Sequence, residues 1–304
     1  MKAQIQGIRR LLAGVAATAA MTAFAGQALA EDLLGQPTPG AIDLQPAASV
    51  LKHDAIWFHD RILMPTITGI TLLVLGLLIW IVVRYNKKAN PVAAKFSHNT
   101  TIEIIWTLLP VAILMVISIF SFQLLFRYND MPKPYMTVKA TGYQWYWGYE
   151  YPDQKVSEII STGLSEAQVA ERGLPHGLYG LAANEAMVVP VGKVVRVQVT
   201  GADVIHAFAL PAFGLKIDAI PGRLNETWFN AEKVGTYYGQ CSELCGVDHS
   251  FMPIEIKVVS QADFDAWVAS KTTPAAPVAA APAAVTPAAA PASAPAAAPA
   301  APAA

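Results

Sequence analysis

The residues that could do chemistry are concentrated in the run C-S-E-L-C-G-V-D-H-S-F-M at positions 241–252. Sulfur, imidazole and carboxylate groups come from Cys241, Glu243, Cys245, His249 and Met252, with His206 upstream. Thiolate, imidazole and thioether ligands together suit copper. A single blue-copper site normally uses one Cys, two His and a weak axial Met. The second sulfur therefore favours a pair of coppers that share one electron.

Two other uses of the cysteine pair compete with copper. The chain contains only two cysteines, both in this run, and cysteines of an exported protein most often form a disulfide. His249 and Met252 follow Cys245 by four and seven residues, a spacing of further metal ligands that makes a disulfide less favoured. A Cys2His2 zinc site would leave Met252 unused, since zinc prefers nitrogen, oxygen and thiolate ligands. Copper is the preferred interpretation.

The two ends of the chain have distinct compositions. Residues 1–30 contain a basic start, an apolar Ala-rich stretch and a final A-L-A, which is typical of a secretory signal peptide. An uncleaved membrane anchor is the alternative. Residues 271–304 are almost entirely Ala and Pro, which predicts a disordered tail. The charge is balanced, with 21 basic and 22 acidic residues, so composition gives no indication of nucleic-acid binding.

Two apolar runs, residues 62–83 and 104–126, are each long enough to span a bilayer and contact membrane lipid. The connecting loop at residues 84–103 is basic, with Arg84, Lys87, Lys88 and Lys95. The positive-inside rule places that loop in the cytoplasm and both termini outside. We therefore expect a multi-pass protein of the bacterial inner membrane. Residues 31–61 form its periplasmic N-terminal segment, residues 62–126 its hairpin and residues 127–270 its periplasmic domain.

Glu103 lies at the cytoplasmic start of the second apolar run, where two roles compete. Thr100-x-x-Glu103 is typical of a helix capping box. An ionisable group at a membrane boundary could also feed a proton path. The residues alone favour the cap.

The periplasmic part has the pattern of an all-β domain. Residues 194–200 and 254–258 alternate apolar and polar side chains between segments rich in Gly and Pro. This pattern predicts a β-sandwich or Greek-key barrel, with the metal ligands in loops at strand ends. Ser260 and Asp263 predict the start of a short terminal helix through Trp267. Residues 153–184 have the composition of a polar, partly irregular insertion without chemistry.

These motifs together resemble subunit II of the haem-copper cytochrome c oxidases, of the bacterial type similar to the mitochondrial enzyme. The resemblance covers E-I-I-W-T-L-L-P, G-Y-Q-W-Y-W-G-Y-E-Y, D-V-I-H-A-F, F-G-L-K-I-D-A-I-P-G-R-L-N and Y-Y-G-Q-C-S-E-L-C-G-V-D-H-S-F-M-P. It implies a two-helix transmembrane hairpin followed by a cupredoxin-like Greek-key barrel that holds the binuclear copper centre CuA. The implied side-chain ligands are His206, Cys241, Cys245, His249 and Met252. Glu243 matches the residue that ligates through its backbone carbonyl.

The resemblance also implies roles outside the copper ligands. Trp145 matches the residue where electrons from cytochrome c enter, and Glu103 matches the acid at the mouth of a proton pathway. The Glu243 side chain matches a ligand of a Mg or Mn ion shared with subunit I. The matching docking acids for cytochrome c are Glu150, Asp153 and Asp203. Subunit I, which carries the haems and CuB, and subunit III are the implied membrane partners.

The implied activity is cytochrome-c oxidase, to which this chain contributes electron transfer and not oxygen reduction by itself. Electrons pass from cytochrome c through the copper pair to haem in subunit I, where oxygen is reduced to water with proton pumping. The alternative function is a membrane-anchored periplasmic copper carrier or assembly protein. Such a carrier needs an open, exchangeable site, whereas this ligand set is typical of a closed one.

Overall fold

The computed structural model describes residues 33–92 and 94–272. The predicted signal peptide and nearly all of the predicted Ala/Pro tail therefore lie outside the described residues.

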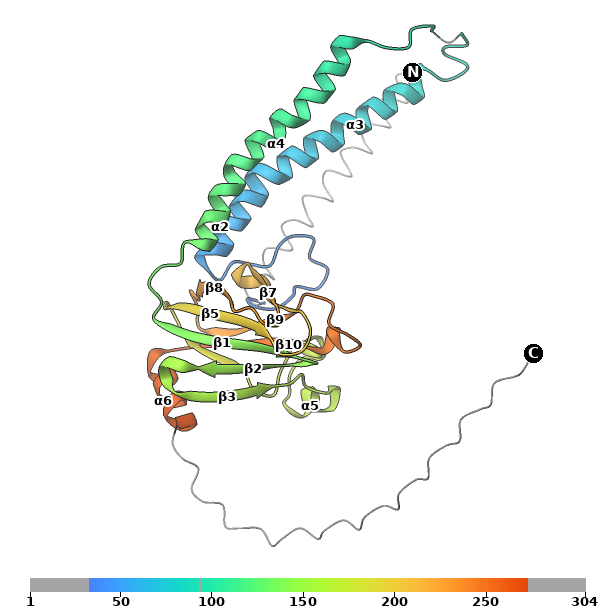
Figure 1. The fold of residues 1–304 in the computed structure, drawn as a ribbon. Helices are drawn as coiled ribbons and strands as arrows, with labels where there is room; N and C mark the ends of the chain where they lie inside the picture. The colour runs from blue at the N-terminus through green and yellow to red at the C-terminus, as the bar shows by residue number, and fades with distance from the viewer. Residues whose placement is uncertain (1–32, 93, 273–304) are drawn as a thin grey trace, which may run out of the picture. The chain divides into compact units, whose positions relative to one another are not determined.

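Two long helical segments precede the β domain (Figure 1). The first consists of α2 (Val50–Phe58), a π-helical turn (His59–Leu63) and α3 (Met64–Arg84), and the second is α4 (Thr100–Asn129). Both are long and apolar enough to cross a membrane. The first begins well before the predicted span because Ser49 caps it, its Oγ accepting the Lys52 N–H at 3.2 Å.

The start of α4 is capped by Asn99, so the prediction of Thr100 as the cap was wrong by one residue. The Asn99 side chain accepts the N–H of Ile102 at 3.2 Å. In return, Glu103 Oε1 accepts the Asn99 N–H at 3.3 Å. Asn caps at least as well as Thr, and here it keeps Glu103 as the acid of the cap.

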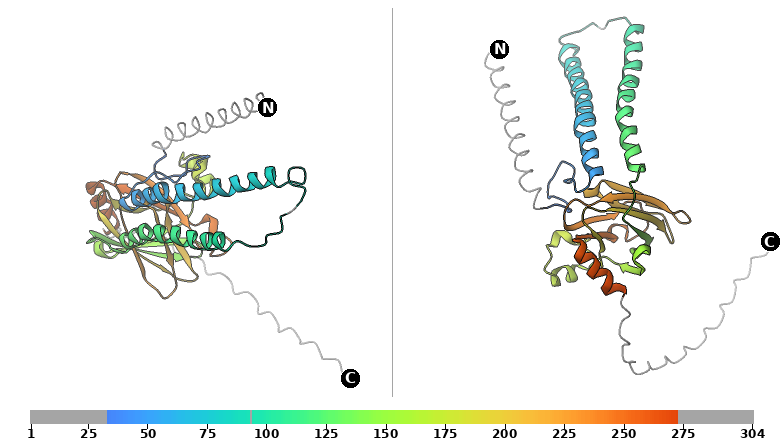
Figure 2. Two further views of the ribbon diagram at one scale, coloured as in Figure 1. Left: turned by 90° about the horizontal axis from the view of Figure 1, so that it is seen from above. Right: turned by 90° about the vertical axis from the view of Figure 1, so that its left-hand side faces the viewer.

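The β domain consists of two five-stranded sheets (Figures 1 and 2). The first has the order β3-β2-β1-β5-β8 and the second the order β4-β10-β9-β6-β7. Most neighbours are antiparallel, but β1 pairs with β5, and β4 with β10, in parallel. The strands are β1 (Met136–Tyr143), β2 (Tyr146–Tyr151), β3 (Val156–Ser161), β4 (Met187–Pro190), β5 (Val194–Gly201), β6 (His206–Leu210), β7 (Leu215–Ala219), β8 (Asn225–Asn230), β9 (Gly235–Cys241) and β10 (Pro253–Val259).

The core lies between the two sheets and follows the predicted alternation on one strand but not on the other. On β5, Val195, Val197 and Val199 are fully buried while their neighbours are partly exposed. On β10, the alternation fails at Glu255, which is buried. Its carboxylate accepts the N–H of Ala183 at 2.8 Å, because the preceding insertion covers this face of the sheet. The buried acid is therefore paired, as burial of a charge requires.

The insertion is more ordered than its composition predicts. It contains β3, the short helix α5 (Glu166–Glu171) and a 3-10 turn (His176–Leu178). Four of its apolar residues form a small hydrophobic cluster with Tyr238 of β9; they are Leu164, Val169, Leu178 and Ala182. The description of this region as partly irregular therefore misses its compact packing.

The last helix, α6 (Gln261–Thr272), begins where Ser260 predicts and extends past Trp267. Ser260 Oγ accepts the N–H of Asp263 at 3.2 Å. The indole of Trp267 packs edge-on against Tyr151, with ring centroids 4.9 Å apart. The helix thereby adds apolar contacts to the core at the end of β2.

Candidate metal centre

Strand pairing brings the predicted metal ligands to one end of the second sheet. His206 is the first residue of β6 and Cys241 the last of β9, and these strands are antiparallel neighbours. Cys245 and His249 follow in the loop after β9, and Met252 directly precedes β10. The ligand atoms of His206, Cys241 and Cys245 lie within 4.8 Å of one another. The ends of two paired strands therefore hold one half of the site, and the loop after β9 holds the other.

The two sulfurs are close but not bonded. Cys241 Sγ and Cys245 Sγ are 3.8 Å apart, and both cysteines are free and buried. Each sulfur has an imidazole beside it. Cys241 Sγ lies 3.9 Å from His206 Nδ1, and Cys245 Sγ lies 3.5 Å from His249 Nδ1. Each sulfur therefore has one imidazole nitrogen as a neighbour, an arrangement that could hold a metal pair.

Glu243 and Met252 complete the set. The Glu243 carbonyl oxygen lies 3.3 Å from Cys241 Sγ, so it faces the sulfurs. Its carboxylate points elsewhere, 3.7 Å from Lys216 Nζ. Met252 is fully buried in the same apolar cluster as the two cysteines. Two thiols, two imidazoles, a thioether and a carbonyl form a donor set that fits copper.

Asp203 orients the first imidazole. Its Oδ1 lies 2.8 Å from His206 Nε2, while Oδ2 accepts the N–H of Gln144 at 2.7 Å. A carboxylate on Nε2 fixes the proton there and leaves Nδ1 free for a metal. Gly142 makes room for the ring, since a Cβ at that position would lie 2.8 Å from His206 Cδ2.

Burial and hydrogen bonding shift the pKa values of the two thiols in opposite directions. Burial opposes ionisation of Cys241, but the hydrogen bonds with His206 and the backbone outweigh it and lower the thiol pKa to about 6. Burial and the adjacent Cys241 raise the pKa of Cys245 to about 12. The Cys241 thiol therefore loses its proton more readily than the Cys245 thiol.

Trp145 is joined to the site by its indole. It lies in the turn between β1 and β2, and its Nε1 donates to the carbonyl oxygen of Cys245 at 3.2 Å. The Gln144 side-chain amide donates to the same oxygen at 2.9 Å. Gly246 permits this close approach, because a Cβ there would lie 2.8 Å from the indole Cζ2.

The three predicted docking acids are not equivalent. Glu150 Oε1 pairs with Lys139 Nζ at 2.7 Å, and Asp153 Oδ2 accepts the N–H of Thr137 at 2.7 Å. Glu150 lies near the end of β2 far from Trp145, and Asp153 lies in the turn just after that strand. Asp203, in contrast, contacts His206 directly. Sequence reasoning missed this contact, although an Asp three residues before a ligating His was a usable signal.

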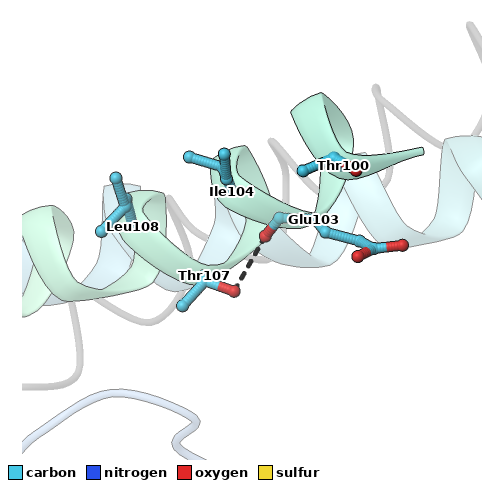
Figure 3. Close-up of a pocket in the computed structure, with 5 residues that line it drawn as sticks. All are labelled: Thr100, Glu103, Ile104, Thr107 and Leu108. Atoms are coloured by element: carbon cyan, nitrogen blue, oxygen red, sulfur yellow. Dashed lines mark hydrogen bonds between the residues drawn. The ribbon is translucent and has the colours of Figure 1, made fainter. Parts of the chain in front are cut away.

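Glu103 lies apart from the copper ligands, in the first turn of α4. Together with Thr100, Ile104, Thr107 and Leu108 it lines an open hollow of about 390 Å³ (Figure 3). The Thr107 hydroxyl donates to the Glu103 carbonyl oxygen at 2.8 Å. Figure 3 shows the Glu103 carboxylate extending away from the helix. The cap contact with Asn99 therefore coexists with an accessible acid.

Comparison with known families accounts for both parts of the chain. Residues 37–124 match the family described as "Cytochrome C oxidase subunit II, transmembrane domain", and residues 136–259 match its "periplasmic domain". Cytochrome c oxidase subunit 2 of Cereibacter sphaeroides is 45% identical over 268 residues, which are 84% of this chain and 88% of the relative. The chain belongs to the cytochrome c oxidase subunit II family. It is thus an inner-membrane subunit of a cytochrome c oxidase, and its His206, Cys241 and Cys245 fit CuA-type copper binding.

Two further similarities lie within this family. A probable cytochrome c oxidase subunit 2 of Rickettsia bellii is 47% identical over 241 residues, covering 79% of this chain and 88% of the relative. The crystal structure of the periplasmic domain of subunit II from Bradyrhizobium japonicum shares 58% identity. It covers 46% of this chain and 96% of its own, with a TM-score of 0.42.

Proposed function

We propose that this subunit receives electrons from cytochrome c at a CuA centre and delivers them to haem in subunit I, where oxygen is reduced to water with proton pumping. The observation that carries the proposal is the pair of free sulfurs 3.8 Å apart, each beside its own imidazole nitrogen. A bound copper pair would store one electron shared between two ions. The side-chain ligands would be His206, Cys241, Cys245, His249 and Met252, with the Glu243 carbonyl.

The chain's own residues supply rigidity to that centre. His206 and Met252 are fully buried, and Cys241 and Cys245 are nearly so. Close-packed surroundings keep ligand positions the same in both redox states. A fixed ligand geometry limits reorganisation, which favours fast electron transfer.

Trp145 is proposed as the residue where electrons enter. Its half-buried indole reaches the copper loop through the hydrogen bond to the Cys245 carbonyl. Glu150, Asp153 and Asp203 are proposed as docking acids that steer a basic cytochrome c by charge. Asp203 would then have two roles, since it also holds His206.

The remaining assignments concern the membrane partners. The Glu243 carboxylate, which lies 3.7 Å from Lys216 Nζ, is proposed as a ligand of a Mg or Mn ion shared with subunit I. Glu103 is proposed as the mouth of a proton pathway, supported by its position at an open hollow. The basic loop at residues 84–103 supports a cytoplasmic placement, with both termini and the copper domain periplasmic. Subunit III completes the proposed assembly.

Rapid-mixing kinetics test the proposal on the copper-loaded full chain with reduced cytochrome c. For Trp145→Phe, which cannot donate to Cys245, we expect the transfer rate to fall by about 100-fold, the size of effect that follows loss of a fixed geometry. Trp267→Phe is the matched control, because Trp267 lies in α6 and packs against Tyr151 of β2. Equal rates for wild type and Trp145→Phe would contradict this path.

A further inference from the structure

Residues 162–184, called here the clamp segment, form a compact layer beside the loop that carries the copper ligands. An isolated β-bridge between Gly163 and Ala183 closes its base. Arg172 Nη1 and Nη2 donate to the carbonyl oxygens of Ala183 and Asn184 at 3.0 and 3.1 Å. Val169, buried in the small apolar cluster, fixes its helix. The clamp segment is therefore held together by its own contacts.

The first connection from the clamp segment to the copper loop is the side-chain amide of Gln240. Its Nε2 lies 3.0 Å from the carbonyl oxygen of Gly180 and 3.4 Å from that of Ser250. Gly180 belongs to the clamp segment, whereas Ser250 lies in the 3-10 turn His249–Phe251. One amide group thus joins the clamp segment to the turn that presents a copper ligand.

The second connection is apolar and steric. The rings of Tyr179 and Phe251 contact each other, with centroids 5.8 Å apart. Gly163 places its backbone directly against the same turn, because a Cβ at that position would lie 3.0 Å from the Phe251 carbonyl oxygen. Two separate parts of the clamp segment, at Gly163 and at Tyr179, therefore contact Phe251.

A third connection fixes the strand that follows the turn. The N–H of Ala183 donates to the buried carboxylate of Glu255 at 2.8 Å, and Glu255 lies on β10 shortly after Met252. This hydrogen bond anchors the chain just after Met252. The clamp segment thus contacts the middle of the stretch from His249 to Met252 and also the strand that follows it.

The turn itself has few internal restraints. Phe251 N–H donates to Asp248 O at 2.9 Å, and His249 N–H to Gly246 O at a longer 3.3 Å. Val247, just before it, is 83% exposed. Short 3-10 turns have poor hydrogen-bond geometry, whereas metal ligands must be held within about 0.5 Å of their working positions. The required rigidity has to come from outside the turn.

We propose that the clamp segment positions the His249–Met252 half of the copper centre, with Gln240 and Tyr179 as its positioning residues. The inference rests on the proposed copper-binding function and extends it. A region that the sequence presents as an insertion without chemistry sets the geometry of one imidazole and the thioether.

Amide hydrogen exchange on the metal-free full chain in detergent tests the clamp without any copper. Gln240→Leu removes the bridging amide, and Tyr179→Leu removes the ring contact. We expect exchange of the amides at residues 246–252 to rise by about tenfold in each, the effect of losing a contact of about 1.4 kcal/mol. Glu166→Gln is the matched control, because Glu166 pairs with His176 on the outside of the clamp segment.

Copper retention gives the second readout on the same variants. We expect release of bound copper to a chelator to accelerate about tenfold in Gln240→Leu and Tyr179→Leu, as for residues that orient metal ligands. The paramagnetic resonance spectrum should also show unequal sharing of the electron. Tyr179 is partly exposed, so Tyr179→Leu keeps the inference testable if Gln240→Leu does not fold.

The outcomes separate this inference from the proposed function. Exchange and release within about twofold of wild type in both variants would overturn the clamp, as would an equal change in Glu166→Gln. A wild-type chain that binds no copper pair would overturn the proposed function. In that case the exchange of the metal-free chain still decides whether the clamp holds the turn.

Discussion

The Asp203 carboxylate is the group whose removal should weaken copper binding without removing a ligand. It lies 2.8 Å from His206 Nε2 and accepts the Gln144 N–H at 2.7 Å. Asp203→Asn keeps an oxygen acceptor but loses the negative charge. Asp203→Ala loses both, so the ring of His206 is free to turn and to change tautomer.

The size of the effect follows from these contacts. Partners that hold the second nitrogen of a metal-binding His typically change metal affinity by about 10–100-fold. Loss of a charge-assisted hydrogen bond of about 1.5–3 kcal/mol falls in the same range, at about 1.4 kcal/mol per tenfold. Because the Asp203 side chain is 35% exposed, water screens its charge. We therefore expect about tenfold for Asp203→Asn and closer to 100-fold for Asp203→Ala.

Chelator competition on the full chain measures these affinities. Asp153→Asn is the matched control, since Asp153 binds the Thr137 N–H away from the copper ligands. All three variants should slow the association of cytochrome c at low salt if these acids steer docking. Only the Asp203 variants should lose copper affinity. Wild-type copper affinity in Asp203→Ala would refute the positioning argument and leave Asp203 as a docking residue alone.

Two further predictions concern the scaffold. Gly142→Ala should push the ring of His206 from its place, lower stability by about 1–3 kcal/mol and distort the copper spectrum, as judged by urea unfolding and absorbance. An undisturbed spectrum would show that the ring has room to move. Glu255→Leu leaves the Ala183 N–H unpaired and should cost about 1–3 kcal/mol, whereas Glu255→Gln keeps an acceptor and should cost less. Equal unfolding midpoints for the two Glu255 variants would contradict the role of this hydrogen bond.

The sequence predicts the metal ligands better than it predicts the residues that position them. Two cysteines, two histidines and a methionine in one pattern indicate copper by ligand chemistry alone, and the structure brings His206, Cys241 and Cys245 together. The contacts of Asp203 and Gln144 were not foreseen, because they depend on how separate loops meet after folding. Such contacts leave little trace in periodicity or composition.

The fold shows the same division. The alternation on β5 predicts its buried face, and the apolar run 62–83 predicts a membrane-spanning helix. The actual helix begins at Val50, because its polar first turns are stabilised by the Ser49 cap and by burial of Leu51. Glu255 breaks the alternation on β10 because the insertion buries it and supplies a donor. A local cap extended the helix, and a tertiary contact buried Glu255.

The central claim is that Cys241 and Cys245 bridge two coppers that share one electron. Copper analysis and electron paramagnetic resonance of the copper-loaded full chain test it most directly. We predict two coppers per chain and hyperfine splitting from one electron shared equally by two copper nuclei. A single-copper spectrum, or a copper-free chain whose two cysteines oxidise to each other after reduction and reconstitution, would contradict it.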